Sequence, residues 1–189
     1  MKELRQGLLI FFFLSVVCGG IYPAVVTLVA GSIFPHQAAG SFVKDANGRV
    51  IGSSLIGQPF SDPQYFWPRP SATGTFAYNP SASGGANLGP TNPAFLAAVA
   101  DRVAVLRAAG VTGPVPADLV LASASGLDPH VTPAGARAQV ARVARARGID
   151  VTDLEQLVAS RVEPPQFGIL GEPRVNVLEL NVALDRLKH

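Results

Sequence analysis

The clearest pattern in the sequence is a long apolar stretch near the N-terminus. No Asp, Glu, Lys or Arg occurs from Gln6 through Val43, and residues 8–34 are dense in Leu, Ile, Val and Phe. As a helix, residues 8–34 would reach about 40 Å, which exceeds the ~30 Å hydrocarbon core of a bilayer. The pattern predicts a transmembrane helix at 8–34, a short head at 1–7 and one globular domain at 35–189.

Three other interpretations of the apolar stretch fit it less well. A cleaved signal peptide has a shorter apolar region, of about 7 to 15 residues. A lipoprotein site at Cys18 would need a small residue where Val17 stands. A buried core helix is rarely apolar on every side over this length. An uncleaved anchor is therefore the prediction.

Two features inside the stretch bear on helix packing. Pro23 interrupts the helical hydrogen bonds, which membrane helices tolerate where neighbouring helices or water satisfy the freed carbonyl. Gly19, Gly20 and Ala24 lie close to helical spacing. Either they form a small-residue face that another helix approaches, or they cluster by chance.

The orientation of the helix rests on few charges. Lys2 and Arg5 precede the apolar stretch, whereas Lys44 and Arg49 lie some distance beyond it. A short basic head favours a cytoplasmic N-terminus, which would place residues 35–189 outside the cytoplasm.

The first half of the globular part combines a hairpin signal with a long irregular segment. Asn47-Gly48, between short apolar runs, is a strong signal for a two-residue hairpin turn. Residues 58–93 are rich in Pro, Gly, Ser and Asn, which predicts an ordered loop. The segment is also aromatic, with Phe60, Tyr65, Phe66, Trp67, Phe76 and Tyr78. These side chains either pack into their own domain or form an interface with a partner.

The second half of the chain carries helix signals. Asn92-Pro93 and Thr132-Pro133 each place a capping side chain before a proline, which predicts helices at 93–109 and 133–147, each followed by Gly. Further helical segments are expected at 116–120, at 152–161, where Thr152 and Glu155 have capping-box spacing, and at 176–187. Inward-facing residues are expected to be Phe95, Leu96, Val99, Val103 and Leu106 in the first helix, and Val177, Leu180, Leu184 and Leu187 in the last. With the hairpin, the elements predict an α+β domain.

The helix at 133–147 is unusually basic. Its Val140 and Val143 are expected to face inward, and Arg137, Arg142, Arg145 and Arg147 mostly outward. Such a face either meets anionic lipid or an acidic partner, or is simply solvated.

Composition excludes several classes of function. Only 15% of residues are charged and 48% are hydrophobic, which indicates a membrane or a large buried interface. The net charge is +2 and the basic residues are scattered, so nucleic acid is not an expected partner. Cys18 is the only cysteine, and the 3 His residues are far apart without clustered carboxylates. Neither a disulfide framework, a metal site nor a bound cofactor is therefore predicted.

Two local motifs are candidates for chemistry. The glycine-rich loop Ser83-Gly84-Gly85-Ala86-Asn87 could turn several N–H groups toward an anion or a nucleotide phosphate, with Ser83, Gly84, Gly85 and Asn87 as its contacts. It lacks the Gly-Lys-Ser/Thr ending of a P-loop, and a tight structural loop is the other interpretation.

The second motif gathers Ser125, Asp128 and His130 within a few residues. A membrane-anchored hydrolase would use Ser125 as nucleophile and His130 as base. Natural triads draw their members from distant segments, however, and Asp128 before a proline is also typical of a turn.

Several longer segments together resemble a known family, and the similarity covers nearly the whole chain in order. They are Tyr65-Phe-Trp-Pro-Arg-Pro-Ser-Ala72, Tyr78-Asn79, Ser83-Gly-Gly-Ala-Asn-Leu-Gly-Pro-Thr-Asn92, Ser125-Gly-Leu-Asp-Pro-His130 and Leu170-Gly-Glu-Pro-Arg-Val-Asn-Val-Leu178. These segments are similar to the C subunit of the Kdp potassium-transporting ATPase.

The resemblance implies a non-catalytic, single-pass subunit of a bacterial inner-membrane complex that takes up potassium with ATP. Its implied partners are the ion-conducting channel subunit, the P-type ATPase subunit, the small F subunit and membrane lipid. The implied role is assembly or stability of the complex, and the family has also been described as a catalytic chaperone that raises the ATP affinity of the P-type ATPase subunit. A domain outside the cytoplasm could not touch that ATP, so the resemblance favours structural coupling.

Overall fold

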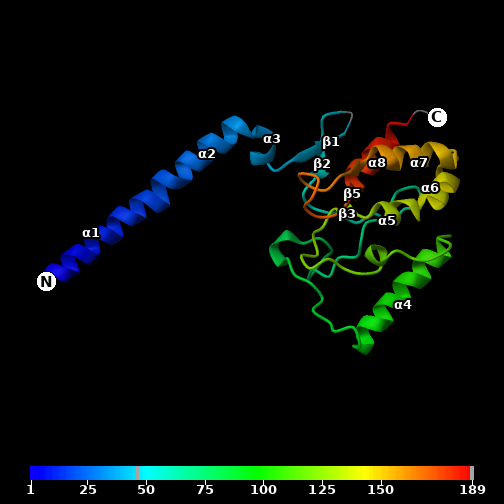
Figure 1. The fold of residues 1–189 in the computed structure, drawn as a ribbon, viewed down its shortest axis with the longest axis horizontal. Helices are drawn as coiled ribbons and strands as arrows, with labels where there is room; N and C mark the ends of the chain where they lie inside the picture. The colour runs from blue at the N-terminus through cyan, green and yellow to red at the C-terminus, as the bar shows by residue number, and fades with distance from the viewer. Residues whose placement is uncertain (46, 188–189) are drawn as a thin grey trace. The chain divides into compact units, whose positions relative to one another are not determined.

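The computed structural model describes residues 1–45 and 47–187, and the chain divides into two compact units, Met1–Phe42 and Val43–His189. Figure 1 shows the elements of each unit. Together they confirm the predicted fold class, a long apolar N-terminal helix followed by an α+β domain.

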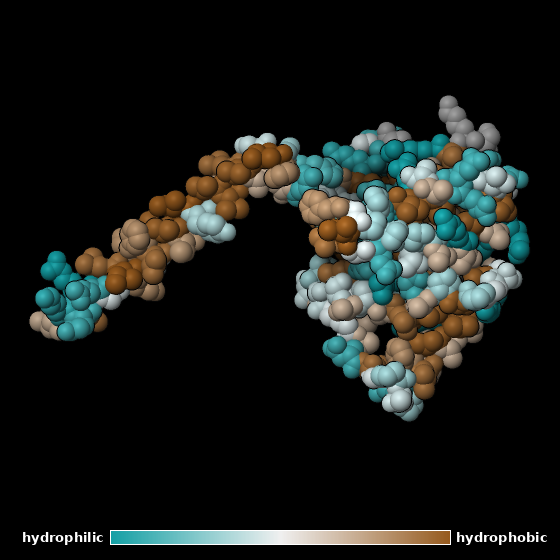
Figure 2. All heavy atoms as spheres, in the orientation of Figure 1, coloured by the Kyte–Doolittle hydropathy of each residue, from teal (hydrophilic) through white to brown (hydrophobic). Residues whose placement is uncertain are grey.

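The first unit is dominated by one continuous helix, Lys2–Ile33. It consists of α1 (Lys2–Val16), a π-helical turn η1 (Val17–Ile21) and α2 (Tyr22–Ile33), and a short helix α3 (Pro35–Ala38) follows. Its most apolar window has a mean hydropathy of 2.3, and 0% of that window is buried. Figure 2 shows hydrophobic residues along most of its length. The helix is long and apolar enough to cross a membrane, and it is the one such helix among the described residues.

Two details of this helix were not predicted. Helical structure begins at Lys2, so the residues of the expected head at 1–7 are helical, and the position of that head in the cytoplasm stays a prediction. Hydropathy marks only the apolar part of a helix, whereas its hydrogen bonds continue through polar residues. The π-helical turn lies just before Pro23, whose ring nitrogen has no hydrogen to donate. Such wider turns are common where the helical hydrogen-bond pattern is interrupted.

The domain opens with the predicted hairpin. Strand β1 (Phe42–Lys44) pairs with β2 (Val50–Ser53). The Asp45 N–H donates to the Arg49 carbonyl at 2.9 Å, and Gly48 has a φ of 79°. The Asp45 carboxylate also accepts the N–H groups of Asn47 and Arg49, both at 2.9 Å. The hairpin is thus confirmed, but its loop is longer than the predicted two residues, because the last paired residues are Asp45 and Arg49 and Gly48 closes the loop in a left-handed conformation.

A second sheet was not predicted. It is antiparallel, with the order β3-β5-β4, and contains β3 (His130–Val131), β4 (Val162–Glu163) and β5 (Arg174–Asn176). In the central strand, Val175 lies opposite Val131 on one side and Val162 on the other. Strands this short carry no visible alternation of apolar and polar residues, so only tertiary pairing defines them.

The helices of the domain are α4 (Pro93–Ala108), α5 (Pro133–Arg137), α6 (Val140–Arg147), α7 (Val151–Ser160) and α8 (Val177–Asp185). Single 3-10 turns are η2 (Pro80–Ala82) and η3 (Ala117–Leu119). The side chains of Asn92, Thr132 and Asn176 accept N–H groups in the first turns of α4, α5 and α8. Helix initiation was therefore predicted correctly at Asn92 and Thr132, and for the same physical reason, whereas the cap at Asn176 was not predicted.

Two helix predictions were wrong in detail. The segment 133–147 is two helices, because the backbone at Gln139, with φ −98° and ψ −12°, leaves the helical ladder between α5 and α6. The helix after Gly148 is capped by Asp150, whose carboxylate accepts the Thr152 N–H at 2.7 Å. The capping box at Thr152 and Glu155 therefore does not form, since Thr152 already lies inside α7.

The core lies between the second sheet, helices α5 to α8 and the aromatic segment. Fully buried members include Leu154, Val158, Val175, Leu180 and Leu184. Phe66 is also fully buried among them, and Tyr65 and Trp67 pack against the cluster. Of the two interpretations of the aromatic segment, packing into its own domain is thus confirmed for this part of it.

Candidate functional site

The aromatic segment is held in the domain by two side-chain amides. The Asn181 Oδ1 accepts the Phe66 N–H at 2.9 Å and its Nδ2 donates to the Phe66 carbonyl at 3.0 Å. Gln139 does the same at Trp67, with 2.8 Å to the N–H and 3.0 Å to the carbonyl. Both amides are almost entirely buried. They replace the partner strand that an extended buried segment would otherwise need.

Two arginines of α6 reinforce this attachment, contrary to the predicted outward face. The Arg142 guanidinium stacks 4.1 Å from the centroid of the Trp67 ring and donates to the Pro63 carbonyl and to the Gln139 Oε1, both at 2.6 Å. Arg147 lies over Tyr65, donates to the Gln64 carbonyl at 2.8 Å and pairs with Asp185 at 2.6 Å.

The exposed part of the basic face is therefore narrower than predicted. Arg142 is 4% exposed, and burial lowers the pKa of its guanidinium to about 10. Arg137 and Arg145 are exposed as expected. Helical spacing could not reveal the inward arginines, because a stacked aromatic ring and free carbonyls in another segment attract them.

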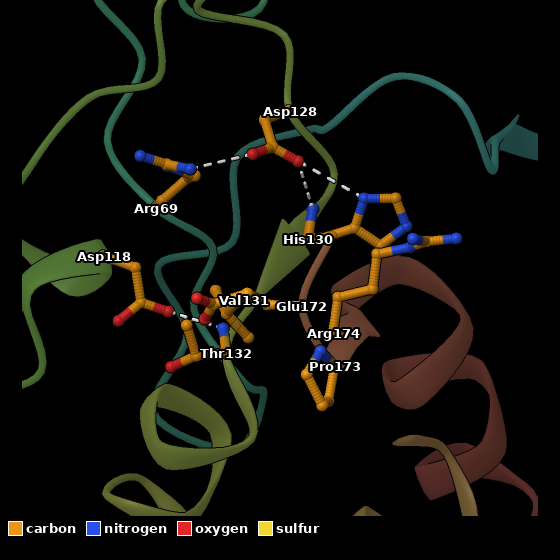
Figure 3. Close-up of a pocket in the computed structure, with 9 residues that line it drawn as sticks. All are labelled: Arg69, Asp118, Asp128, His130, Val131, Thr132, Glu172, Pro173 and Arg174. Carbon is orange, nitrogen blue, oxygen red and sulfur yellow. Dashed lines mark hydrogen bonds and ion pairs between the residues drawn. The ribbon is translucent and has the colours of Figure 1, made fainter. Parts of the chain in front are cut away.

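A polar cleft of about 390 Å³ lies beside strand β3. Its central group is Asp128, which pairs with the Arg69 guanidinium at 2.8 Å and accepts the His130 N–H at 2.9 Å (Figure 3). The His130 Nδ1 lies 3.3 Å from the same carboxylate. Burial alone would raise the pKa of Asp128, but the bonds from His130 and Arg69 outweigh it and hold that pKa at about 2.

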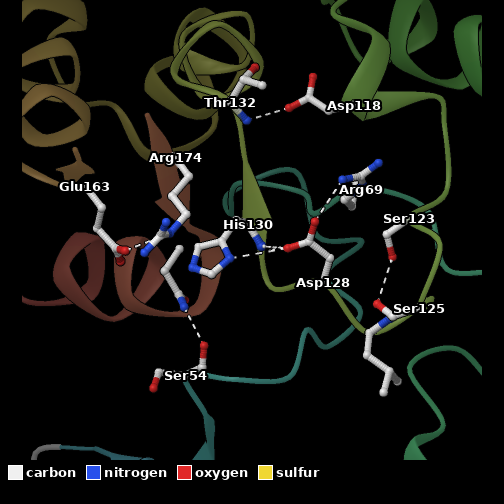
Figure 4. A network of polar contacts seen from close by, with 12 residues as sticks. Ser54, Arg69, Asp118, Ser123, Ser125, Asp128, His130, Thr132, Glu163 and Arg174 are labelled. Carbon is white, nitrogen blue, oxygen red and sulfur yellow. Dashed lines mark hydrogen bonds and ion pairs between the residues drawn. The ribbon is translucent and has the colours of Figure 1, made fainter. Parts of the chain in front are cut away.

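Glu172 also lines the cleft, and two further carboxylates of this region, Asp118 and Glu163, are bonded within the domain. The Asp118 carboxylate accepts the Thr132 N–H at 2.6 Å, at the start of α5. The Glu163 carboxylate pairs with Arg174 at 3.0 Å across β4 and β5 (Figure 4). Each of these bonded acids is thus committed to joining segments of the domain. The arrangement stabilises the fold, and the described residues around the cleft place no nucleophile beside a base.

An apolar groove of about 380 Å³ lies between the aromatic segment and α4. Its lining includes Phe60, Trp67, Pro68, Tyr78 and Val105. Val105 is 57% exposed, and Leu96, predicted to face inward from the same helix, is 53% exposed. Within α4 only Leu106 is buried, so the helix covers the domain along a narrow stripe and leaves apolar surface free.

The glycine-rich loop packs along residues 123–126. The Gly84 N–H donates to the Ser125 carbonyl at 2.9 Å, and the Ser83 hydroxyl donates to the same oxygen at 3.1 Å. A side chain at Gly85 would stand 3.1 Å from the Ala124 carbonyl oxygen, which explains the need for glycine there. Asn87 has a φ of 51°. Anion binding by Ser83, Gly84, Gly85 and Asn87 stays a prediction.

The proposed Ser125 and His130 pair does not form. The Ser125 hydroxyl lies 3.4 Å from that of Ser123 and accepts the Leu127 N–H at 3.1 Å. The His130 ring contacts Asp128 instead, and Figure 4 shows Ser125 turned to Ser123 and away from His130. Sequence proximity brought the residues near one another, but the turn at Asp128 separates their side chains.

No group of three or more His, Cys, Asp or Glu side chains with metal-site geometry occurs within residues 1–45 and 47–187. The residues that organise the site and that sequence reasoning missed are Gln139, Asn181, Arg142 and Arg69. For Asn181 the signal in the sequence is a polar residue at an otherwise inward helix position, between Leu180 and Leu184.

The fold and these contacts define a class of protein. An apolar helix of membrane length is joined to a small domain in which Asp128, Glu163 and Asp185 pair with arginines of the same domain, and this combination indicates an anchored accessory subunit. Residues 4–186 match the family model for KdpC, the K+-transporting ATPase c chain. The chain therefore belongs to the KdpC family, and it is a non-catalytic subunit of the potassium-transporting Kdp ATPase.

Relatives match this chain over almost its whole length. The Potassium-transporting ATPase KdpC subunit of Geotalea uraniireducens is 61% identical over 187 residues, covering 99% of each chain. That of Geobacter sulfurreducens is 59% identical with the same coverage, and that of Methylococcus capsulatus is 54% identical over 100% of each chain. The resemblance seen in the sequence is confirmed, and the hydrolase alternative is wrong.

Proposed function

We propose that this chain is an assembly subunit that holds the channel subunit, the P-type ATPase subunit and the small F subunit together in the inner membrane. In this proposal residues 1–7 lie in the cytoplasm, residues 8–34 cross the bilayer, and the domain at 35–189 lies outside the cytoplasm. The basic residues Lys2 and Arg5 support that orientation.

The observation that carries the proposal is the unburied surface of the helix Lys2–Ile33. None of its most apolar window is covered by the rest of the chain. Side chains added at Gly19 or Gly20 would meet nothing within 4 Å, so a flat strip is open for close approach by another helix. The covering surface must come from lipid and from other subunits.

The apolar groove beside α4 supports a second contact, from the domain to a partner subunit. Exposed Val105 and the groove wall at Phe60 and Pro68 form one apolar region. An interface between domain and partner would bury this region, as the apolar centre of a protein interface. The effect on ATP affinity would then pass through subunit contacts, without direct contact between this domain and the nucleotide.

A helix exchange tests the proposal. Residues 8–34 are replaced by an unrelated transmembrane helix of the same length, with Lys2, Arg5 and the domain retained. The tagged chain is then purified from membranes, and the co-purifying channel and P-type ATPase subunits and the potassium-stimulated ATPase activity are measured. We expect assembly and activity to be lost. The matched control replaces Cys18 with Ala, which keeps the strip at Gly19 and Gly20, and should assemble fully.

The proposed orientation needs its own measurement. A Phe76→Cys substitution in a Cys18→Ala chain places one thiol at an exposed position of the domain. A membrane-impermeant maleimide added outside intact spheroplasts should label it. Labelling from the cytoplasmic side alone would overturn the orientation, and would favour nucleotide contact by the glycine-rich loop at Ser83 to Asn87.

A further inference from the structure

The connection between β4 and β5 ends in an exposed apolar tip. Phe167 is 84% exposed, Ile169 is 83% exposed and Leu170 is 55% exposed. Figure 1 draws the backbone of this connection in orange. Single exposed apolar residues are common in soluble proteins, but three within four positions form a patch that a protein normally covers. We name residues 166–171 the tip loop.

We propose that the tip loop inserts its Phe167 and Ile169 side chains among the lipid acyl chains at the membrane surface. This inference rests on the proposed function in one respect, because it requires that the helix Lys2–Ile33 anchors the domain beside a bilayer.

The tip loop is already formed for such a contact. The Gln166 N–H donates to the Leu170 carbonyl and the Leu170 N–H to the Gln166 carbonyl, both at 2.9 Å. The Gly168 N–H donates to the Pro165 carbonyl at 2.9 Å, and the Ile169 N–H to the Gln166 carbonyl at 3.3 Å. These four main-chain donors would therefore enter an apolar environment already satisfied, which lowers the cost of placing the loop there.

The backbone also fixes the direction of the apolar side chains. Phe167 has a φ of 54° and Gly168 a φ of 77°, so two consecutive residues adopt left-handed conformations that close the turn. Pro164 and Pro165 before the turn and Pro173 after it restrict the chain further. Little conformational entropy is lost when a rigid loop is buried.

The tether keeps the domain near the bilayer, and the small exposed area of the tip loop favours lipid over a protein partner. Helix α2 ends at Ile33 and strand β1 begins at Phe42, so the chain between them extends at most about 30 Å. The bilayer surface is thus always within reach of the domain. Three side chains of this size expose on the order of 400 Å², about half of what each partner contributes to an ordinary protein interface.

The charges around the tip loop indicate whether lipid headgroups or acyl chains provide the contact. Arg174 at its base pairs with Glu163 at 3.0 Å, and Glu172 adds a negative charge next to the loop. No basic side chain lies between Pro164 and Pro173. Attraction to anionic headgroups is therefore not expected to drive the contact. We expect burial of the apolar side chains in the acyl region to drive it.

The experiment uses the full chain reconstituted in phosphatidylcholine vesicles. Phe167→Cys and Ile169→Cys are each introduced into a Cys18→Ala chain and labelled with an environment-sensitive fluorophore. Vesicles with brominated acyl chains then report lipid contact by quenching. Phe76→Cys, an aromatic residue 59% exposed elsewhere in the domain, is the matched control. The native chain labelled at Cys18 reports whether the helix is embedded.

We expect blue-shifted emission and quenching by brominated lipid at positions 167, 169 and 18, and neither effect at 76. Quenching at 18 without quenching at 167 and 169 would overturn the inference while leaving the anchor intact. Absence of quenching at 18 would overturn the proposed anchor and the inference together. Protection of the label at 167 from aqueous iodide without lipid quenching would show that protein covers the loop, and would also overturn the inference.

Discussion

The Gln139 side-chain amide and the Trp67 main chain form a two-way hydrogen-bonded pair. The Trp67 N–H donates to the Gln139 Oε1 at 2.8 Å, and the Gln139 Nε2 donates to the Trp67 carbonyl at 3.0 Å. Gln139 is fully buried and also accepts a bond from Arg142 at 2.6 Å. One amide thus joins the break between α5 and α6 to the aromatic segment and to a buried guanidinium.

Removing this amide is expected to destabilise the domain strongly. Gln139→Ala leaves the Trp67 N–H, the Trp67 carbonyl and one Arg142 donor without partners, and it opens a cavity. We expect the free energy of unfolding to fall by about 3 kcal/mol. Urea unfolding followed by the fluorescence of Trp67, the only tryptophan, measures it. Gln156→Ala, on the exposed side of α7, should change stability by less than ~0.5 kcal/mol.

The inward Arg142 and the exposed Arg145 predict unequal effects of substitution within one helix. Arg142→Lys keeps the charge but loses the planar stack on Trp67 and the forked donation to Gln139 and Pro63. We expect a loss of about 2 kcal/mol and a shifted Trp67 emission maximum. Arg145→Lys, at an exposed position three residues later, is the control and should leave both unchanged. Equal effects of the two substitutions would contradict the inward placement of Arg142.

Acid should weaken the domain through Asp128. Its pKa in the folded chain is about 2, below the ordinary value of 3.8, so the unfolded chain binds the proton first. The stabilisation is therefore complete above pH ~4 and is lost as the pH falls toward 2. Because the side chain is 27% exposed, we discount its contribution to on the order of 1 kcal/mol.

The measurement compares thermal unfolding midpoints between pH 5 and pH 2 in the native chain and in Asp128→Asn. The variant should be less stable at pH 5 and should lose less stability on acidification. Asp101→Asn, on the exposed surface of α4, should keep the native pH dependence. An unchanged pH profile in Asp128→Asn would show that the bonds from His130 and Arg69 do not stabilise the ionised Asp128 carboxylate.

The groove predicts a defect in assembly without a defect in folding. Val105→Asp places a charge in the apolar wall at a residue that is already 57% exposed, so the domain should remain folded. If a partner subunit covers the groove, co-purification of the channel and P-type ATPase subunits should fall at least about tenfold, because an unpaired charge would be buried there. Ala104→Asp, exposed on the same helix outside the groove lining, should assemble normally. Full assembly of the Val105→Asp chain would exclude the groove as a docking surface.

Much of the fold could be predicted from local pattern. The apolar stretch at 8–34 predicts the long helix because hydropathy over this length admits few other structures. Asn92-Pro93 and Thr132-Pro133 predict helix starts because the capping bonds are made within the same few residues. Asn47-Gly48 predicts the hairpin for the same reason.

The second sheet and the arginine positions could not be predicted in this way. Strands β3, β4 and β5 exist only through pairing between residues more than ten positions apart, such as Val131 with Val175. Arg142 points inward because of Trp67, a residue in another segment. Similarly, Ser125 and His130 are close in sequence, yet their hydrogen bonds run to Ser123 and Asp128.

The sequence by itself determined the apolar helix, the α+β composition and the family, because each depends on residue types and short spacings. The tertiary structure alone decided which polar residues hold the aromatic segment. Gln139 and Asn181 satisfy the main chain of Trp67 and Phe66 from distant helices, and the pairing of buried hydrogen-bonding groups is a property of three-dimensional packing. It also decided that Phe167 and Ile169 remain uncovered, since only the folded chain shows which apolar residues found no partner.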